Sequence, residues 1–381
     1  MITLPTVTGP LPIHSVTGPV LPHEHLVLDL DRTGDRAAVL HPEHHAPAVT
    51  GELAALREDF GLSLLIEPTC RGMGRDAPAL ARISRASGVA VIAATGWYYE
   101  PFHPPEIRGD PVELLTETLV REIVDGIGYE TGTGYGYETG TGTAYSTGYG
   151  YGYGTAYRTS TSTSTSTAYD TSHGPGVGIH PSGARPARIR PGLIGEVGSH
   201  GEEPSEPEAR VLRAAARAAL ATGLSVATHA HLGHGGPAQL ALLTHEGLAP
   251  ERVSIGHQDL LDQPSVHRAL AASGAYIAFD TIGKERYRSD GERLRSLLAL
   301  LDAGHADRAL LSCDISRHAY LRSEGGQGYG HLFHAFLPAL RAAGADDALL
   351  DLLTRRNPLR FLTGTDPGPR TPTPGPTPQE P

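Results

Sequence analysis

The chain has 381 residues, of which 39% are hydrophobic, so it is long enough to bury a sizeable core. Its formal net charge of −11 at pH 7 argues against a nucleic-acid partner, because binding to phosphates requires a basic surface. It contains no apolar run of about 18 residues, so we expect no membrane span. Residues 1–20 lack the pattern of a secretory signal, and two cysteines cannot build a disulfide framework. These features predict a cytoplasmic protein.

Two segments lack the apolar periodicity that a buried face requires. Residues 128–172 form a low-complexity tract of Tyr, Gly, Thr and Ser, which we interpret as an expanded loop inserted into a folded domain. Residues 365–381 are rich in Pro and Thr and are expected to form a disordered C-terminal tail. The remaining residues, 1–127 and 173–364, have the size of one barrel domain.

Short apolar runs alternate with amphipathic stretches along this domain. Each run is nearly continuous in Ala, Val, Ile or Leu, as expected for a strand that is buried on both faces. In chain order the predicted strands are 19–25, 62–68, 89–95, 193–197, 225–229, 253–257, 276–280 and 309–314. Predicted helices include 111–127, 205–221 and 292–303, and Ser205 and Glu208 have the spacing of a capping box.

This alternation of eight strands with helices predicts an α/β fold of the (β/α)8 (TIM) barrel type. An open, doubly wound sheet is the alternative. No glycine-rich phosphate loop follows the first predicted strand, and this weighs against a dinucleotide-binding sheet.

Side chains that commonly bind metal ions lie at the ends of five of these strands. They are His23 and His25 on the first strand, Glu196 on the fourth, His229 on the fifth, His257 on the sixth and Asp314 on the eighth. In a barrel, the C-terminal ends of the strands converge on one mouth, where active sites are built. We therefore expect these six residues to face one another.

A pair of divalent metal ions explains this set better than packing does. Alternate residues of a strand point to the same side, so His23 and His25 can both face the interior while Glu24 faces away. A single histidine at a strand end is usually a satisfied polar residue, but buried carboxylates without a compensating cation are costly. Nitrogen and oxygen ligands suit two ions, Zn²⁺ in first place, with Mn²⁺, Fe²⁺ or Co²⁺ as alternatives. His231 competes with His229 for the role of ligand, and we prefer His229 because it directly follows an apolar run.

The segments around these residues resemble the phosphotriesterase family of the amidohydrolase superfamily. The matching segments, in the order of the family, are LPHEHLVLD, IEPTCRGMGRD, ATGWYY, GLIGEVG, THAH, IGHQDL, AFDTIGK, LLSCD and RRNPLRFL. The resemblance implies that His23, His25 and Asp314 hold a buried metal ion and that His229 and His257 hold a more exposed one. It also implies a homodimer.

The fourth strand departs from a common pattern of this family. Many members bridge the two metal ions with a carboxylated lysine at this position, but here the stretch reads Gly195-Glu196, and Lys284 is the only lysine of the chain. Glu196 can supply a bridging carboxylate directly, as in the branch of phosphotriesterase homology and phosphotriesterase-related proteins. This departure weighs against strong organophosphate hydrolysis.

The predicted activity is hydrolysis of an ester-type bond in a small molecule by a hydroxide that bridges the two metal ions. Asp314 is expected to accept the proton, and Tyr98 to donate a hydrogen bond to the developing oxyanion, although Tyr98 can equally be an aromatic plug of the loop. Lys284, with Arg286 or Arg317, is expected to bind an anionic group of the substrate. This favours a lactone, for example a phosphorylated sugar lactone.

Two other functions remain open from the sequence. The first is a phosphotriesterase or phosphodiesterase, which the same metal centre would serve. The second is a non-catalytic, metal-bound scaffold in which the tract at 128–172 mediates assembly. Only the unusual composition of that tract favours the scaffold.

Overall fold

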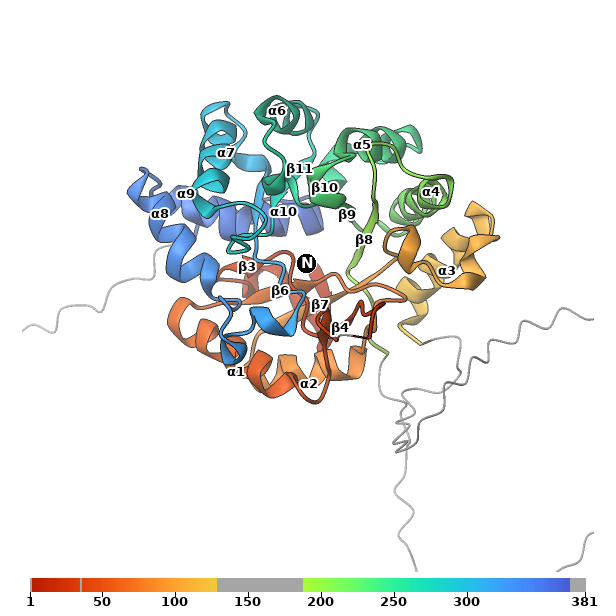
Figure 1. Cartoon of the computed structure of the whole chain (residues 1–381), viewed down its shortest axis with the longest axis horizontal. Helices are drawn as coiled ribbons and strands as arrows, with labels where there is room; N and C mark the ends of the chain where they lie inside the picture. Colours follow the sequence, from red (N-terminus) through yellow and green to blue (C-terminus); the bar gives the residue numbers. More distant parts are fainter. Residues whose placement is uncertain (1, 35, 129–187, 371–381) are drawn as a thin grey trace, which may run out of the picture.

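Eight parallel strands occupy the centre of the molecule, and helices surround them (Figure 1). The computed structural model describes residues 2–34, 36–128 and 188–370. Residues 129–172 of the predicted insertion, residues 173–187 of the predicted domain and residues 371–381 of the predicted tail lie outside the described residues. Residues 365–370 lie against the end of the domain, where the carboxylate of Asp366 accepts hydrogen bonds from the guanidinium of Arg356.

The strands of the central sheet follow one another in chain order around the barrel. They are β3 (Val20–Leu21), β6 (Leu64–Glu67), β7 (Ala90–Thr95), β8 (Leu193–Ser199), β9 (Val226–Ala230), β10 (Val253–Ile255), β11 (Tyr276–Phe279) and β12 (Ala309–Leu311). Every pairing between neighbours in this sheet is parallel. The predicted barrel is thereby confirmed, and its eight strands coincide in position with the eight predicted runs.

The helices follow the strands, as the βα repeat requires. They are α1 (Ala46–Phe60), α2 (Ala77–Ser87), α3 (Val112–Asp125), α4 (Glu206–Thr222), α5 (Gly236–His245), α6 (Pro264–Ala272), α7 (Asp290–Asp302), α8 (Leu337–Ala342), α9 (Asp347–Asp351) and α10 (Asn357–Thr363). The predicted capping box at the start of α4 is present, and α7 begins with a second one, formed by Ser289 and Glu292. None of the helices of the described residues is long and apolar enough to cross a membrane.

Two short antiparallel pairs of strands were not predicted. The first, β1 (Thr3–Thr6) with β2 (Gly9–Pro12), lies against β7 through a hydrogen bond from the amide of Val7 to the carbonyl of Val91. The second pairs β4 (Leu28–Asp29) with β5 (Val39–Leu40) in the segment after the first barrel strand. Both involve few residues, so their apolar pattern is too short to be recognised in the sequence.

The core has two parts because both faces of the barrel strands are buried. Alternate residues, such as Leu64 and Ile66, join one apolar cluster, which also contains Leu359 and Phe361 of α10. The residues between them, such as Leu65, join a larger cluster with the side chains of the surrounding helices. We assign the smaller cluster to the barrel interior and the larger one to the layer between strands and helices.

Glu24 joins the first and last strands of the barrel, β3 and β12. One oxygen of its carboxylate accepts hydrogen bonds from the hydroxyl of Ser312 (2.8 Å) and the amide of Cys313 (2.6 Å), and the other accepts from the amide of Ile315 (2.9 Å). Glu24 is fully buried. The residue predicted to face away from the interior therefore connects two segments that lie almost three hundred residues apart in the chain.

Three strands that precede predicted ligands, β3, β10 and β12, end earlier than predicted, whereas β8 and β9 extend one or two residues beyond their predicted ends. The strand expected at 19–25 is regular only over Val20–Leu21, so His23 and His25 follow it. His257 and Asp314 likewise lie beyond β10 and β12, with φ angles of +55° and +47°. A left-handed backbone is incompatible with an extended strand and is rare outside glycine, so the chain leaves the sheet at these two residues.

Candidate metal centre

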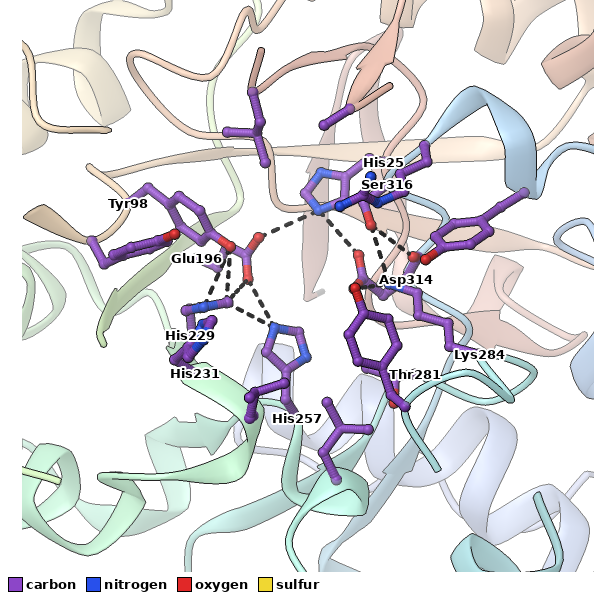
Figure 2. A pocket seen from close by; sticks show the side chains of 18 of the residues that line it. His25, Tyr98, Glu196, His229, His231, His257, Thr281, Lys284, Asp314 and Ser316 are labelled. Carbon is purple, nitrogen blue, oxygen red and sulfur yellow. Dashed lines mark hydrogen bonds and ion pairs between the residues drawn. The ribbon is translucent and has the colours of Figure 1, made fainter. Parts of the chain in front are cut away.

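The six predicted ligands meet at the C-terminal mouth of the barrel. Figure 2 shows five of them, His25, Glu196, His229, His257 and Asp314. They form three overlapping groups in which ligand atoms lie within 4.8 Å of one another: His23, His25 and Glu196; His23, His257 and Asp314; and Glu196, His229 and His257. All six are buried. Such a concentration of imidazoles and carboxylates offers ligands that could hold divalent cations.

Glu196 lies in the middle of this centre. Its Oε1 is 3.3 Å from Nε2 of His25, and its Oε2 is 3.3 Å from Nδ1 of His229. Oε2 also lies 3.6 Å from Nε2 of His23 and 3.7 Å from Nε2 of His257. One carboxylate thus faces ligands of both predicted metal sites, which is the arrangement that a bridging ligand needs.

The environment of two ring nitrogens suits contact with a cation. Nε2 of His23 is buried and has no hydrogen-bond partner, although it faces carboxylate oxygens of Glu196 and Asp314. Nε2 of His257 lies only 2.8 Å from Nδ1 of His229. Buried polar atoms are normally satisfied, so an orphan nitrogen that faces two carboxylates indicates a position for a metal ion.

The acidic groups around His23 favour its protonated form in the absence of a metal ion. Burial alone would lower the pKa of His23, but the carboxylates of Asp280, Glu196 and Asp314 outweigh it and raise the pKa to about 9. Burial also opposes ionisation of Glu196, yet His23 and the hydrogen bonds from the other rings hold its pKa well below the usual range. The metal-free site therefore contains an ionised Glu196 beside a protonated His23.

Asp280 belongs to this centre and was not among the predicted site residues. It directly follows β11, its Oδ1 is 2.9 Å from Nδ1 of His257, and its Oδ2 is 2.9 Å from Nδ1 of His23. The rule that located the predicted ligands, a polar side chain at the end of a predicted strand, applies equally to Asp280, which is not itself one of them. His25 has a different hydrogen-bonding partner behind its ring. Its Nδ1 is 2.7 Å from the hydroxyl of Thr69, and this hydroxyl donates a hydrogen bond to Glu67 (2.5 Å).

Tyr98 points into the centre from the segment after β7 (Figure 2). Its hydroxyl is 3.0 Å from Nδ1 of His229, and its side chain is buried. Burial, together with the charge of Glu196, raises the pKa of Tyr98 well above the usual value, so the hydroxyl keeps its proton at neutral pH. The hydroxyl lies beside the predicted ligands, and whether it donates to His229 or accepts from it depends on the tautomer of that ring.

The three predicted substrate-binding cations have different positions. Lys284 is buried, its ammonium forms an ion pair with Asp314 and it donates to the hydroxyl of Ser316 (3.1 Å). Arg317 is half-buried and lines the cavity above the centre. Arg286 is exposed, packs over the ring of Tyr287 and is not among the residues that line the cavity, so the structure does not support a role for it in binding.

His231, the alternative to His229, is not in any of the three groups of ligand atoms. It stacks on His200 with ring centroids 4.0 Å apart and lines the cavity. Burial and the neighbouring imidazoles of His229 and His200 lower the pKa of His231 to about 4, so it is neutral at physiological pH. The preference for His229 agrees with this geometry.

The cavity above the centre has a volume of about 250 Å³ and two different walls. Lys284, Ser316 and Arg317 form the polar wall, next to Asp314. The opposite wall is aromatic and lies next to His229, with Tyr98, Tyr99 and Phe102 packed edge to face or tilted against one another. The small volume limits the site to a small substrate.

The chain is similar to known proteins over most of its length. The model of the phosphotriesterase family matches residues 2–146 and 178–362. The phosphotriesterase homology protein of Escherichia coli is 31% identical over 346 residues, which cover 91% of this chain and 98% of the relative. The crystal structure of that protein, with phosphate in its active site, superposes with a TM-score of 0.73 at 30% identity, covering 91% of this chain and 99% of the other.

The names of two further relatives refer to other hydrolytic activities. A solved structure from the engineering of organophosphate hydrolysis on a weak promiscuous lactonase is 27% identical, with a TM-score of 0.71, and the match covers 95% of this chain and all of the other. The N-acetyltaurine hydrolase of Danio rerio is 25% identical over 386 residues, which cover 91% of this chain and 94% of the relative. The chain belongs to the phosphotriesterase family and is a metal-dependent hydrolase.

Proposed function

We propose that this enzyme hydrolyses a small lactone that carries an anionic group, with two zinc ions held by the six ligands His23, His25, Glu196, His229, His257 and Asp314. The observation that carries the proposal is the polar wall of the cavity, where Lys284 and Arg317 lie next to the ligand set. A cationic wall beside a hydrolytic centre favours a substrate that presents negative charge at a fixed distance from the bond that is cleaved.

The residues divide the chemistry between them. When bound, the two ions would supply an activated water molecule and a Lewis acid. Asp314 lies at the edge of the centre, where its carboxylate can accept the proton of the attacking water and return it to the leaving oxygen. The hydroxyl of Tyr98, on the opposite side of Glu196, can donate a hydrogen bond to the oxyanion.

The anionic group would lie between Lys284 and Arg317. An ammonium has three N–H donors, and Asp314 and Ser316 accept two of those of Lys284, so one donor remains for a substrate. Although burial opposes the charge, the carboxylate of Asp314 keeps the pKa of Lys284 above its usual value, so this side chain is cationic at neutral pH. The phosphate in the active site of the relative from Escherichia coli supports an anion at this mouth.

A second candidate is hydrolysis of an N-acyl amide that carries a sulfonate or carboxylate. The N-acetyltaurine hydrolases favour it, because the compound in their name combines a small acyl group with a sulfonate. A phosphoester remains a third possibility through the organophosphate-hydrolysing relative, although its own starting point was a lactonase.

A matched panel of substrates tests the proposal. Values of kcat/KM are compared for sugar lactones with and without a phosphate, for N-acetyltaurine and for an aryl phosphotriester. We expect kcat/KM for the phosphorylated lactones to be at least tenfold higher than for their neutral analogues. A preference for neutral lactones, for the amide or for the phosphotriester would overturn it in favour of the corresponding alternative.

Two arginine variants make the test specific to the polar wall. Arg317→Ala should raise KM for the anionic lactone about tenfold or more and leave the neutral analogue unaffected, because a charge-assisted contact contributes roughly 1.5–3 kcal/mol. Arg286→Ala is the matched control, since Arg286 is exposed outside the cavity. Equal effects of the two changes would contradict the assignment of the anion to this wall.

A further inference from the structure

Asp280 contacts two predicted ligands that belong to different metal ions. Its Oδ1 accepts hydrogen bonds from the backbone amide of His257 (2.9 Å) and from Nδ1 of the same ring (2.9 Å). Its Oδ2 lies 2.9 Å from Nδ1 of His23. Both histidines are buried and direct their other nitrogen, Nε2, towards Glu196.

We propose that Asp280 is a positioning residue. Through this pair of contacts it orients His23 and His257, which are predicted ligands of different metal ions. A neutral imidazole carries one N–H, so a ring that donates from Nδ1 must present the lone pair of Nε2. Asp280 thereby selects the tautomer in which His23 and His257 can each bind a cation through Nε2. It also holds the left-handed backbone of His257 through the bond to its amide.

The other two histidines of the centre depend on different groups. Nδ1 of His25 contacts the hydroxyl of Thr69, and Nδ1 of His229 itself faces Glu196 and Tyr98. Within the described residues, the support of His23 and His257 therefore converges on one carboxylate. Loss of that carboxylate should affect one ligand of each metal ion, which no change at Thr69 or Tyr98 would do.

A carboxylate suits this position because Oδ1 accepts a hydrogen bond from His257 while Oδ2, 2.9 Å from Nδ1 of His23, can act as the acceptor for that second ring. The amide of an asparagine has the same shape, but it offers one oxygen and one NH₂ group. Its oxygen can accept from only one of the two rings, and its NH₂ group then faces Nδ1 of the other. That second ring must accept at Nδ1 and carry its proton on Nε2, which is the wrong tautomer for binding a metal ion at Nε2.

Zinc binding by Asp280→Asn tests this inference. The wild type and the variant are stripped of metal, dialysed against zinc buffers of defined free concentration and analysed for zinc per chain. We expect two ions in the wild type and a loss of at least tenfold in affinity for one of them in the variant, as supporting hydrogen bonds to ligands typically contribute 10-fold to 100-fold. Two ions bound by Asp280→Asn within twofold of the wild-type affinity would overturn the proposal.

Asp259→Asn is the matched control. Asp259 is also buried and close to the centre, where it accepts hydrogen bonds from Thr281 and pairs with Arg293, but its side chain forms no hydrogen bond or ion pair with the six ligands. A purely structural role of Asp280 would give both variants the same result. We expect Asp259→Asn to lose stability and to keep two ions, and loss of an ion by this variant as well would count against a specific role of Asp280.

A measurement on the wild type covers the case in which Asp280→Asn does not fold. Nitrogen NMR of the ring atoms in the zinc-loaded protein reports which nitrogen carries the proton. Protons on Nδ1 of both His23 and His257 are expected, and a proton on Nε2 of either ring would refute the proposal. The inference rests on the proposed metal centre. Zinc counts and tautomers are measured without substrate, so their results do not depend on whether the substrate is a lactone.

Discussion

The ammonium of Lys284 forms an ion pair with the carboxylate of Asp314, so the only lysine of the chain contacts a predicted metal ligand. Both side chains are buried. In the metal-free protein this cation compensates a charge that a metal ion would otherwise compensate. The contribution of this ion pair to the free energy of unfolding should therefore depend on whether a metal ion is bound next to Asp314.

Replacing Lys284 by methionine should destabilise the metal-free protein more than the zinc-loaded one. Removing one partner of a buried pair leaves the other charge uncompensated and typically costs about 3–5 kcal/mol. Bound zinc would compensate Asp314, so the loss should be smaller in the loaded protein. Urea unfolding of both forms measures the difference. Equal losses of unfolding free energy in the two forms would show that the metal ion does not compensate the charge of Asp314.

Replacing Asp314 by asparagine should reduce kcat by a factor of about 10² to 10⁴, because an amide cannot accept the proton of the attacking water. Zinc content must be measured in parallel, since Asp314 is also a predicted ligand. Asp302→Asn, an exposed carboxylate at the end of α7, serves as the control. Turnover within a few-fold of the wild type would refute the role of Asp314 as the proton acceptor.

Zinc binding should release protons at neutral pH. His23 has a pKa of about 9 in the metal-free protein, and a ligand nitrogen must be deprotonated. The apparent affinity should therefore rise as the pH increases from 7 to 9 and change less above 9. Titration calorimetry in buffers of different ionisation enthalpy counts the protons, and a count of zero at pH 7 would contradict a protonated His23.

The same pKa predicts the pH dependence of stability in the metal-free protein. The folded-state pKa of His23 is raised above its unfolded value of 6.5. Its stabilising contribution is therefore fully present below pH 6.5 and is lost as the pH rises through about 9. Denaturant unfolding of metal-free wild type and His23→Gln at pH 6 and pH 9 should show that the two proteins differ more at pH 6.

Glu24→Ala should cost about 3–5 kcal/mol of unfolding free energy. The change leaves the hydroxyl of Ser312 and the amides of Cys313 and Ile315 without their acceptor, at roughly 1–3 kcal/mol for each unsatisfied buried group. Glu43→Ala, at an exposed position before α1, is the control. A loss below about 1 kcal/mol would mean that Glu24 does not hold the first strand to the last.

The sequence predicted the barrel and the grouping of the six candidate ligands because both depend on local patterns. Apolar runs located all eight strands, and the polar residues at their ends located side chains that the structure brings together, among them His23 and Glu196. The partners of Glu24 could not be predicted, since they lie about 290 residues away and become neighbours only when the barrel closes.

Other features depend on details that a residue pattern does not contain. Asp280 follows the same end-of-strand rule as the ligands, but its position behind two rings is a property of side-chain direction. The left-handed backbone at His257 and Asp314 could not be predicted, because neither position is a glycine. Lys284 is expected from the sequence to bind an anionic group of the substrate together with an arginine, and no residue pattern indicates its ion pair with Asp314.

Tyr98→Phe should reduce kcat about 100-fold while zinc content stays at the wild-type level, because it removes one donor to the oxyanion and no predicted ligand. The pKa of Tyr98 lies well above its usual value, so the loss should be constant between pH 6 and pH 9. Tyr99→Phe is the matched control, since Tyr99 stacks its ring on His229 at an interplanar angle of 8° and the variant keeps that ring. If both variants retained wild-type kcat, Tyr98 would be packing against His229, and stabilisation of the oxyanion would have to come from the metal ions alone.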